Sequence, residues 1–416
     1  MARGREFLAW DEWRGSGMVA FTSMAGIALC SSHGYTIGVM IAPLEEAFGW
    51  SRSAITGGLL IISTLAVVLA PLTGRLADRI GPRKVVLAGV PLFCLAFGML
   101  SLATADIWTW WALWLFLAFG NMACLPTIWA AAINTHFDRN RGKALALAMC
   151  GTGLASFILP RVTPRLIEAY GWRWSYVLLA LFGFLIVYPL ALAFFRGAHE
   201  RPGEKHAPPP SRALRGEMLS RRYLKLLGAS TFFSVTICAL TTNAAPLMRG
   251  FGYSNIDAGD IASWMGLGSI VGRLLGGVLL DRFDAKKVAA ISVMAPMVTA
   301  VLLLGAGDNR MVAVLAMLVL GLAIGTEVDA CSYLAARHFG MGNFGALFGF
   351  INGLMLFGNG VAPFAANYVY DLTHSYDAAL WVQLPACTAA AVLFLMLGKY
   401  PDDVETMRPR LQSAPA

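Results

Sequence analysis

The chain has 416 residues, of which 57% are hydrophobic and 13% are charged, and its net charge is +8. Soluble domains are roughly 45–50% apolar and about 25% charged, so this composition excludes an ordinary soluble enzyme or binding domain. The apolar residues recur along the whole chain in runs of about 20 residues, long enough to cross a hydrocarbon layer of about 30 Å as helices.

These runs predict an all-α polytopic membrane protein with twelve transmembrane helices. The helices are expected at about 17–42, 54–77, 84–104, 107–134, 142–167, 174–195, 223–247, 259–281, 286–306, 311–336, 344–370 and 377–399. The longest soluble connection is basic and contains three consecutive prolines, which indicates a flexible linker. The predicted organisation is an N-terminal six-helix bundle (1–195), a cytoplasmic linker (196–222), a C-terminal six-helix bundle (223–399) and a cytoplasmic tail (400–416).

The distribution of Lys and Arg predicts the orientation of these helices. With the amino terminus inside, most of the 32 basic residues fall in cytoplasmic segments. The outer side then carries Arg52, Arg161, Arg165, Arg173, Arg249 and Arg310. This asymmetry is the positive-inside signal, so the basic charge needs no nucleic acid to explain it. We expect an integral protein of the bacterial cytoplasmic (inner) membrane with both termini cytoplasmic and no cleavable signal peptide. The seven cysteines are isolated within apolar runs, so neither a disulfide framework nor a metal site is predicted.

A charged turn between the second and third expected helices recurs in the second half of the chain. It reads Gly74-Arg75-Leu76-Ala77-Asp78-Arg79-Ile80-Gly81-Pro82-Arg83-Lys84, and a weaker copy runs from Gly277 to Lys287, with Asp281 lying 203 positions after Asp78. Ala42-Pro43-Leu44 recurs at the same offset as Ala245-Pro246-Leu247. Six helices per half preserve orientation, so the repeats are parallel, and this arrangement places a substrate site between the halves near the membrane midplane.

Gly74, Asp78, Arg79, Gly81 and Arg83 match the signature Gly-x-x-x-Asp-Arg/Lys-x-Gly-x-Arg, and the chain resembles the major facilitator superfamily over essentially its whole length. Phe48 to Ile55, Gly171-Trp172-Arg173 and an arginine in the eighth helix are similar to the monocarboxylate and oxalate/formate transporter branch. The resemblance implies that the motif is a conformational latch that holds the outward-open state. Gly74 is expected to permit close helix approach and Gly81 to form a turn, and a plain positive-inside loop is the alternative.

The second copy of the motif contributes Asp281 and Arg282 to the expected latch. It has Asp284 and Lys286 in place of the later glycine and arginine, so we expect it to be the weaker latch.

Arg273 is the one basic residue that this topology places inside the membrane. It lies eight residues before Asp281, about 12 Å from the cytoplasmic end of its helix. A guanidinium at this depth usually faces a cavity or a partner. Gly268, Gly272 and Gly276 form a stripe for close packing, with Ser269 and Arg273 on the adjoining stripe. Arg273 suits a carboxylate, and the resemblance implies that it binds the carboxylate of the substrate. Ser269 can look into the same central cavity and is a further candidate substrate-binding residue. A structural pair with Glu327 or Asp329 is the alternative.

Glu327 and Asp329 are the intramembrane acids of the tenth helix. Two residues apart on a helix, they lie on different faces, Glu327 on the more apolar one. Either acid, or His33 in the first helix, is a candidate to carry a coupling proton. Tyr35, Asn121 and Asn352 are candidate substrate-binding residues in helices that line such cavities, with packing as the alternative role. The animal monocarboxylate carriers have a lysine near Tyr35 and an aspartate at the Ser269 position, and neither is present here.

No Gly-x-x-x-x-Gly-Lys-Ser/Thr loop is present, so neither an enzyme nor a nucleotide-driven pump is indicated. We expect a secondary active transporter that moves a small organic anion, a mono- or dicarboxylate, by alternating access with proton symport. An organic-anion exchanger and a proton-coupled exporter of amphipathic compounds are the alternatives. The expected partners are the organic anion, a proton and the lipid bilayer. No cofactor, metal or oligomer is required.

Overall fold

The computed structural model describes residues 10–195, 214–340, 344–398 and 400, and within these residues it contains helices and no strand. The first half forms α1 (Trp10–Cys30), α2 (Ser32–Phe48), α3 (Arg52–Ile80), α4 (Pro82–Met99), the 3-10 turn η1 (Leu100–Leu102), α5 (Ile107–Met122), α6 (Pro126–His136) and α7 (Arg141–Phe194). The second half forms α8 (Leu214–Met218), α9 (Arg221–Thr241), α10 (Ala244–Gly250), α11 (Asn255–Arg282), α12 (Ala285–Ser292), α13 (Ala295–Ala306), α14 (Arg310–Phe339), α15 (Phe344–Thr373) and α16 (Asp377–Leu395).

The prediction of twelve membrane-spanning helices is confirmed. Eleven helical segments of the described chain are long and apolar enough to cross a membrane. One of them, Arg141–Phe194, has 54 residues and would extend about 81 Å if it were straight. It is broken at Gly171, whose φ of 78° and ψ of 164° are not helical. This segment therefore supplies two spans.

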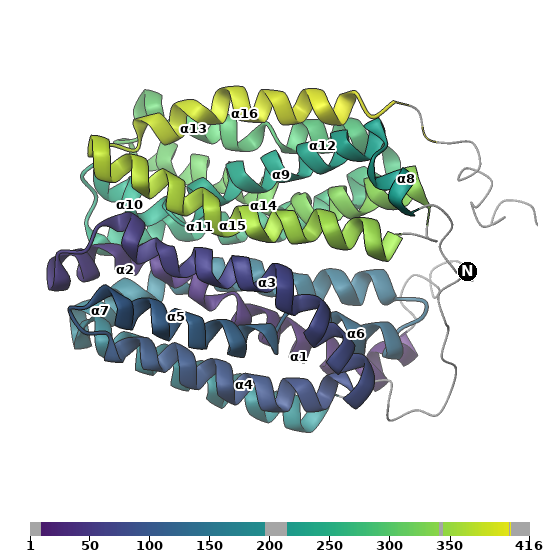
Figure 1. Ribbon diagram of the computed structural model, residues 1–416, viewed down its shortest axis with the longest axis horizontal. Coiled ribbons are helices and arrows are strands. Elements are labelled where there is room, and N and C mark those ends of the chain that lie inside the picture. Colours follow the sequence, from purple (N-terminus) through teal and green to yellow (C-terminus); the bar gives the residue numbers. More distant parts are fainter. Residues whose placement is uncertain (1–9, 196–213, 341–343, 399, 401–416) are drawn as a thin grey trace, which may run out of the picture.

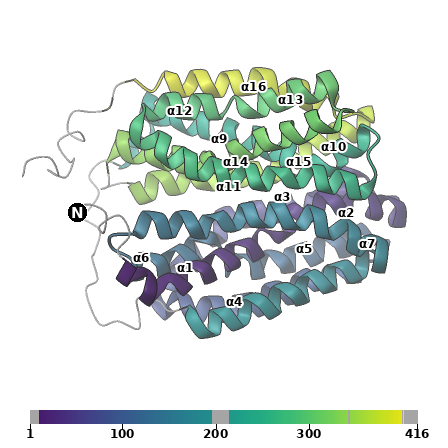
Figure 2. The same cartoon turned by 180° about the vertical axis from the view of Figure 1, so that it is seen from behind.

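Two hydrophobic bundles build the molecule. The core of one consists of residues between Val19 and Phe195, and the core of the other consists of residues between Tyr223 and Leu397. Figure 1 shows the purple-to-blue bundle below the green-to-yellow one, and Figure 2 shows the same division from behind. Of the predicted linker, residues 196–213 lie outside the described residues, and α8 is a short helix that the linker prediction did not include. Residues 401–416 of the predicted tail also lie outside the described residues.

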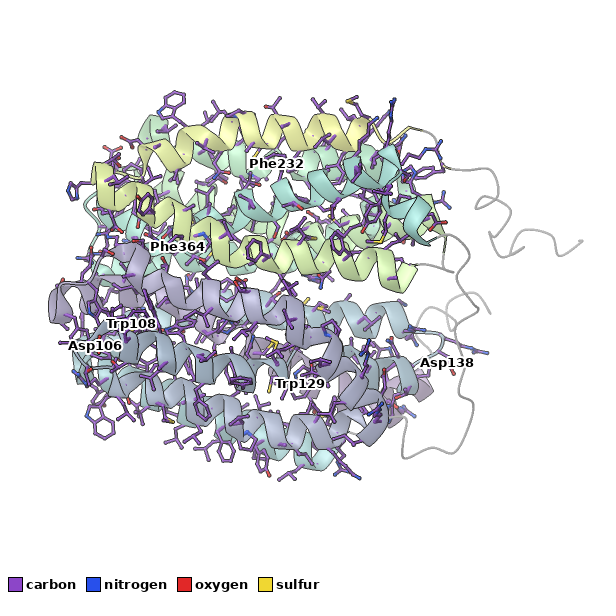
Figure 3. All side chains as sticks on the ribbon, viewed as in Figure 1. Asp106, Trp108, Trp129, Asp138, Phe232 and Phe364 are labelled. Carbon is purple, nitrogen blue, oxygen red and sulfur yellow. The ribbon has the colours of Figure 1, made fainter. Side chains whose placement is uncertain are left out.

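The helix connections gather at two opposite ends of the molecule. We call the end that carries residues 49–51, 103–106, 251–254 and 307–309 the Trp50 end, and the end that carries residues 81, 137–140, 283–284 and 340 the Gly81 end. Figure 3 shows Asp106 and Trp108 at one end and Asp138 at the other. Ser51, Asp106, Ser254 and Asn309 begin helices at the Trp50 end, where each side chain accepts a backbone N–H bond of the first turn.

The halves pack closely at the Trp50 end and lie apart near the Gly81 end. A Cβ on Gly259 or Gly266 of α11 would overlap the backbone of α7, and one on Gly360 of α15 would overlap Ser63 of α3. Towards the Gly81 end, a groove of about 650 Å³ separates α3 from α15, with Val67, Val68 and Pro71 on one side and Gly345, Gly349 and Gly353 on the other. Among the described residues, the groove between α3 and α15 thus opens towards the Gly81 end, and these close contacts lie nearer the Trp50 end.

Candidate functional site

A central cavity of about 300 Å³ lies between the two halves. Residues of α1, α2, α3, α5, α6 and α7 form one wall, and residues of α9, α11, α14 and α15 form the other. Three interruptions in the helices border the cavity, at Ser31, at Leu125 and at Thr242. Non-helical backbone at membrane depth is tolerated where it lines a cavity, because its polar groups can bind water or a ligand. The cavity thus lies between the two halves, where the repeats predict a substrate site.

Arg273 is held in the wall of the cavity by a tightly packed pair of helices. A Cβ on Gly268 or Gly272 of α11 would overlap the backbone of α14, and one on Gly325 of α14 would overlap the backbone of α11. The predicted small-residue stripe is thus a close helix seam. The Arg273 side chain is 6% exposed, and its Nη1 lies 3.3 Å from Oδ2 of Asp329. Its buried Nε has no hydrogen-bond partner among the described residues. The guanidinium therefore keeps a donor for a further acceptor.

The two intramembrane acids occupy different surroundings. Glu327 lines the cavity and is 8% exposed, and within the described chain its Oε1 is buried without a hydrogen-bond partner. Asp329 pairs with Arg273 and keeps 37% of its side chain exposed, outside the lining of the cavity. The sequence-based expectation that the acids face different sides agrees with this placement. Of the two acids considered as ion-pair partners of Arg273, Asp329 makes the pair.

Of the other predicted site residues, His33, Tyr35 and Asn121 line the cavity, and Ser269 and Asn352 do not. His33 packs edge-on against Phe93 and Trp114, and its buried Nδ1 has no partner among the described residues. Ser269 is 1% exposed, because it is buried where α11 packs against α14. Asn352 is half-buried on α15. Ser269 is thus buried between α11 and α14, whereas Arg273, one turn away on α11, lines the cavity.

Asn359 lines the cavity instead of Asn352. Its Oδ1 accepts bonds from Ser234 Oγ at 2.6 Å and Cys238 Sγ at 3.0 Å, both on α9. The spacing of seven residues from Asn352 places both amides on nearly the same helix face. The sequence marks both asparagines on this face, and only the structure shows which of them is at the depth of the cavity. Among the described residues, no cluster of three or more His, Cys, Asp or Glu could hold a metal ion.

The residues of the expected latch all lie at the Gly81 end. Gly81 has a φ of 92°, which confirms the predicted turn. The Nη2 of Arg83 donates to the carbonyl of Leu192 at the end of α7, within the same half. Asp78 and Arg79, like Asp281 and Arg282 at the end of α11, are exposed. A Cβ on Gly74 would meet nothing within 4 Å, so the close helix approach expected there is not made in this structure.

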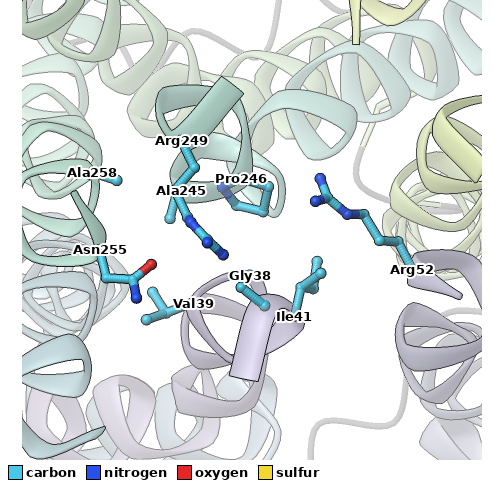
Figure 4. Close-up of a pocket in the computed structure, with 10 residues that line it drawn as sticks. Gly38, Val39, Ile41, Arg52, Ala245, Pro246, Arg249, Asn255 and Ala258 are labelled. Carbon is cyan, nitrogen blue, oxygen red and sulfur yellow. The ribbon is translucent and has the colours of Figure 1, made fainter. Parts of the chain in front are cut away.

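Polar contacts join the halves at the Trp50 end. The guanidinium of Arg165 on α7 makes two bonds of 2.8 Å to the carboxylate of Asp260 on α11. Asp371 on α15 accepts backbone N–H bonds from the start of α3. A small cavity of about 10 Å³ also lies at this end. Arg52 and Arg249, from opposite halves, line it (Figure 4). An ion pair and a carboxylate cap thus join the two halves at the Trp50 end.

Comparison with known proteins gives the family. The model of the Major Facilitator Superfamily matches residues 18–352 and 226–413. The 3-(3-hydroxy-phenyl)propionate transporter of Escherichia coli K12 is 28% identical over 257 residues, 59% of this chain and 60% of that protein. The 4-hydroxybenzoate transporter PcaK of Acinetobacter baylyi is 26% identical over 408 residues, 85% of each chain. Human monocarboxylate transporter 11 is 29% identical over 266 residues, 59% of this chain and 52% of that protein.

Solved structures agree on the fold. The nucleoside transporter NupG, as the D323A mutant, superimposes with a TM-score of 0.74 at 14% identity, covering 92% of this chain and 99% of that one. A bacterial homologue of the human lysosomal transporter Spinster, inward-facing and unoccupied, superimposes with a TM-score of 0.70 at 15% identity, covering 92% and 98%. The matched family model, the twelve apolar spans and the shared fold lead to one conclusion: this chain is an integral membrane protein of the major facilitator superfamily of transporters.

Proposed function

We propose that this protein is a secondary active transporter that carries a small organic anion with one carboxylate group, coupled to a proton, by alternating access. In this proposal the Gly81 end is the cytoplasmic end of a protein of the bacterial inner membrane, as the distribution of Lys and Arg favours. The open groove between α3 and α15 at the Gly81 end and the packed contacts at the Trp50 end then correspond to an inward-facing state.

The observation that carries the proposal is the position of Arg273. It is the one cationic side chain among the residues that line the cavity. Asp329 engages its Nη1, and its Nε is left without a partner within the described chain. A planar guanidinium with a remaining donor suits a carboxylate, and a charge-assisted bond of this kind is stronger than a neutral one. A single cation that already has a carboxylate counter-ion favours a monocarboxylate over a dicarboxylate.

The rest of the cavity supports an anion with an apolar body. Its volume of about 300 Å³ is at the lower end of the roughly 300–1,000 Å³ of small-molecule sites. The wall opposite Arg273 is neutral, with apolar residues such as Leu59, Ile62 and Leu125 beside His33 and Tyr35. The names of the relatives, transporters of hydroxyphenylpropionate, hydroxybenzoate and monocarboxylates, are consistent with such a substrate.

Uptake by purified protein in liposomes tests the assignment. Labelled 4-hydroxybenzoate and lactate are offered as carboxylates with an inward proton gradient, and 4-hydroxybenzyl alcohol is offered as an uncharged competitor. Arg273→Ala and Arg273→Lys should lower carboxylate uptake about 10-fold to 100-fold, because a bond to a charged group contributes about 1.5–3 kcal/mol. Lys keeps the charge but loses the planar fork, so it should rescue only partly.

The matched control is Arg310→Ala, which removes an exposed ion pair with Asp257 at the protein surface. This variant should transport normally. Unchanged carboxylate uptake by Arg273→Ala would exclude Arg273 as the anion-binding residue. Uptake that needs the same anion inside the vesicles, and not the proton gradient, would identify an exchanger instead of a symporter.

A further inference from the structure

We propose that Asp371 is the centre of a second latch, at the Trp50 end, which holds the inward-facing state and competes with the latch expected at Gly74 to Arg83. This inference rests on the alternating access of the proposed function. It assigns a role to the first turn of α3 and to the end of α15, neither of which belongs to the central cavity or to the family motif.

The carboxylate of Asp371 caps a helix of the opposite half. Its Oδ1 accepts the backbone N–H of Arg52 and its Oδ2 accepts the backbone N–H of Ser53, each at 3.0 Å. These N–H groups belong to the first turn of α3, where a helix has no intrahelical partner for them and carries a partial positive charge. Ser51 caps the same turn from within its own half, through the N–H of Ala54. The start of α3 is therefore fully capped only while α15 lies beside it.

The side chain of Arg52 extends this contact across the interface. Its Nε bonds to Glu45 of its own half at 2.9 Å, and its Nη1 donates to the hydroxyl of Tyr376 of the other half at 3.2 Å. Its guanidinium carbon lies 3.8 Å from the ring centroid of Tyr370. Tyr370 belongs to α15 and Tyr376 lies just before α16, so the cation is held by aromatic groups that move with the C-terminal half.

A buried amide continues the network below Asp371. One turn before Asp371 on α15, Asn367 accepts the Tyr376 hydroxyl at 2.7 Å and donates to Asn243 at 2.8 Å. It also lies 3.4 Å from the hydroxyl of Thr56 on α3. Asn243 lies at the break between α9 and α10. The latch thus joins α3 of one half to three segments of the other through polar groups that are satisfied by one another.

The geometry of α3 makes the two latches alternatives. This helix of 29 residues extends about 43 Å, with Asp371 bound to its first turn and the Gly74 motif at its other end. Towards the Trp50 end, Gly360 of α15 packs onto α3. A Cβ added at Gly345, Gly349 or Gly353, nearer the Gly81 end, would meet nothing within 4 Å. A rigid-body rotation that closed the groove at Gly349 would pull Asp371 away from Arg52 and Ser53. Figure 1 shows α3 and α15 as the pair that runs along the interface.

Spin-label distances measured without any substrate test the inference. In a background without the seven native cysteines, one label pair at Ala105→Cys and Asp308→Cys spans the Trp50 end, and another at Asp138→Cys and Lys287→Cys spans the Gly81 end. Asp371→Asn should raise the ratio of outward-open to inward-open molecules about tenfold, because it removes the charge and one of the two acceptors; tenfold corresponds to about 1.4 kcal/mol. The Trp50 distance should lengthen while the Gly81 distance shortens.

The controls separate a latch from general loosening. Asp377→Asn removes an exposed carboxyl at the same end and in the same half, and should leave both distances unchanged. Arg52→Ala should have a smaller effect than Asp371→Asn, since the backbone N–H bonds survive it. Identical distance distributions for Asp371→Asn and the parent protein would overturn the inference, and so would lengthening at both ends. Failure of carboxylate transport would leave these distances unaffected, so the proposed substrate and the latch are tested separately.

Discussion

At the residue scale, Glu327 and Asp329 lie two residues apart on α14 but have different surroundings. Asp329 is the counter-ion of Arg273, and under the proposed function an anionic substrate would share or displace that contact. Glu327 faces the cavity with a buried oxygen that has no partner among the described residues. Burial of an ionised carboxylate with an oxygen left unpaired is costly. If transport is coupled to a proton as proposed, Glu327 is therefore the better placed of the two acids to bind it.

Glu327→Gln should lower the uptake driven by a proton gradient about tenfold or more. It should preserve the exchange of internal for external anion. The amide keeps the shape of the acid and cannot bind a proton in its place. Liposome uptake with and without the gradient, compared with counterflow at equal pH, measures the two activities. Asp329→Asn is the comparison, since it should change the KM for the anion while the response to the gradient persists. Gradient-driven accumulation by Glu327→Gln would assign the proton to another group.

At the scale of single elements, the glycines that face one another across α11 and α14 decide where Arg273 lies. Sequence spacing predicts the stripe Gly268, Gly272 and Gly276 on α11, and the structure adds Gly321 and Gly325 on α14 as its partners. Small residues let helix backbones approach in a membrane, where lipid provides no hydrophobic force between helices. The close seam buries Ser269 and holds Arg273 at the cavity wall.

Gly325→Ala should destabilise the protein by about 1–3 kcal/mol and lower anion uptake, since its Cβ would overlap the carbonyl of Ser269 and press on the backbone of Arg273. Thermal unfolding in detergent and liposome uptake measure the two effects. Gly277→Ala is the matched control on α11, because its Cβ meets nothing within 4 Å. A Gly325→Ala protein as stable and as active as Gly277→Ala would show that the seam tolerates extra volume.

At the scale of the whole molecule, the open groove between α3 and α15 predicts how transport can be blocked without disturbing the fold. Gly349→Leu adds a side chain that the groove accommodates in this structure. The same side chain would obstruct closure of the halves at the Gly81 end. We expect normal thermal stability, an unchanged Gly81-end label distance and uptake reduced at least tenfold.

Gly305→Leu is the control for that variant, because Gly305 is an exposed position on α13 whose Cβ also meets nothing within 4 Å. It should transport normally. Equal activity of the two variants would mean that closure does not bring α3 onto Gly349.

Much of the fold is predictable from sequence, because each membrane span is a local property. Hydrocarbon requires every backbone group to be satisfied within its own helix, so about 20 apolar residues suffice to define a span. The break at Gly171 and the turn at Gly81 follow from glycines with positive φ between apolar runs. Arg273, Glu327, His33, Tyr35 and Asn121 stand out in the sequence because polar residues are rare inside apolar runs, and they line the cavity. Ser269 and Asn352 stand out for the same reason and do not line it, since depth and rotation along a helix depend on its neighbours.

The sequence by itself determined the membrane class, the twelve spans, the repeat and the family, all of which depend on composition and on spacing along one chain. Only the tertiary structure decided that Asp329 pairs with Arg273, that Glu327 faces the cavity, and that Asp371 caps a helix more than 300 residues away. Such pairings depend on how helices from distant parts of the chain rotate and pack against one another. Which end of the interface is closed depends on the same long-range packing, so no local pattern indicates it.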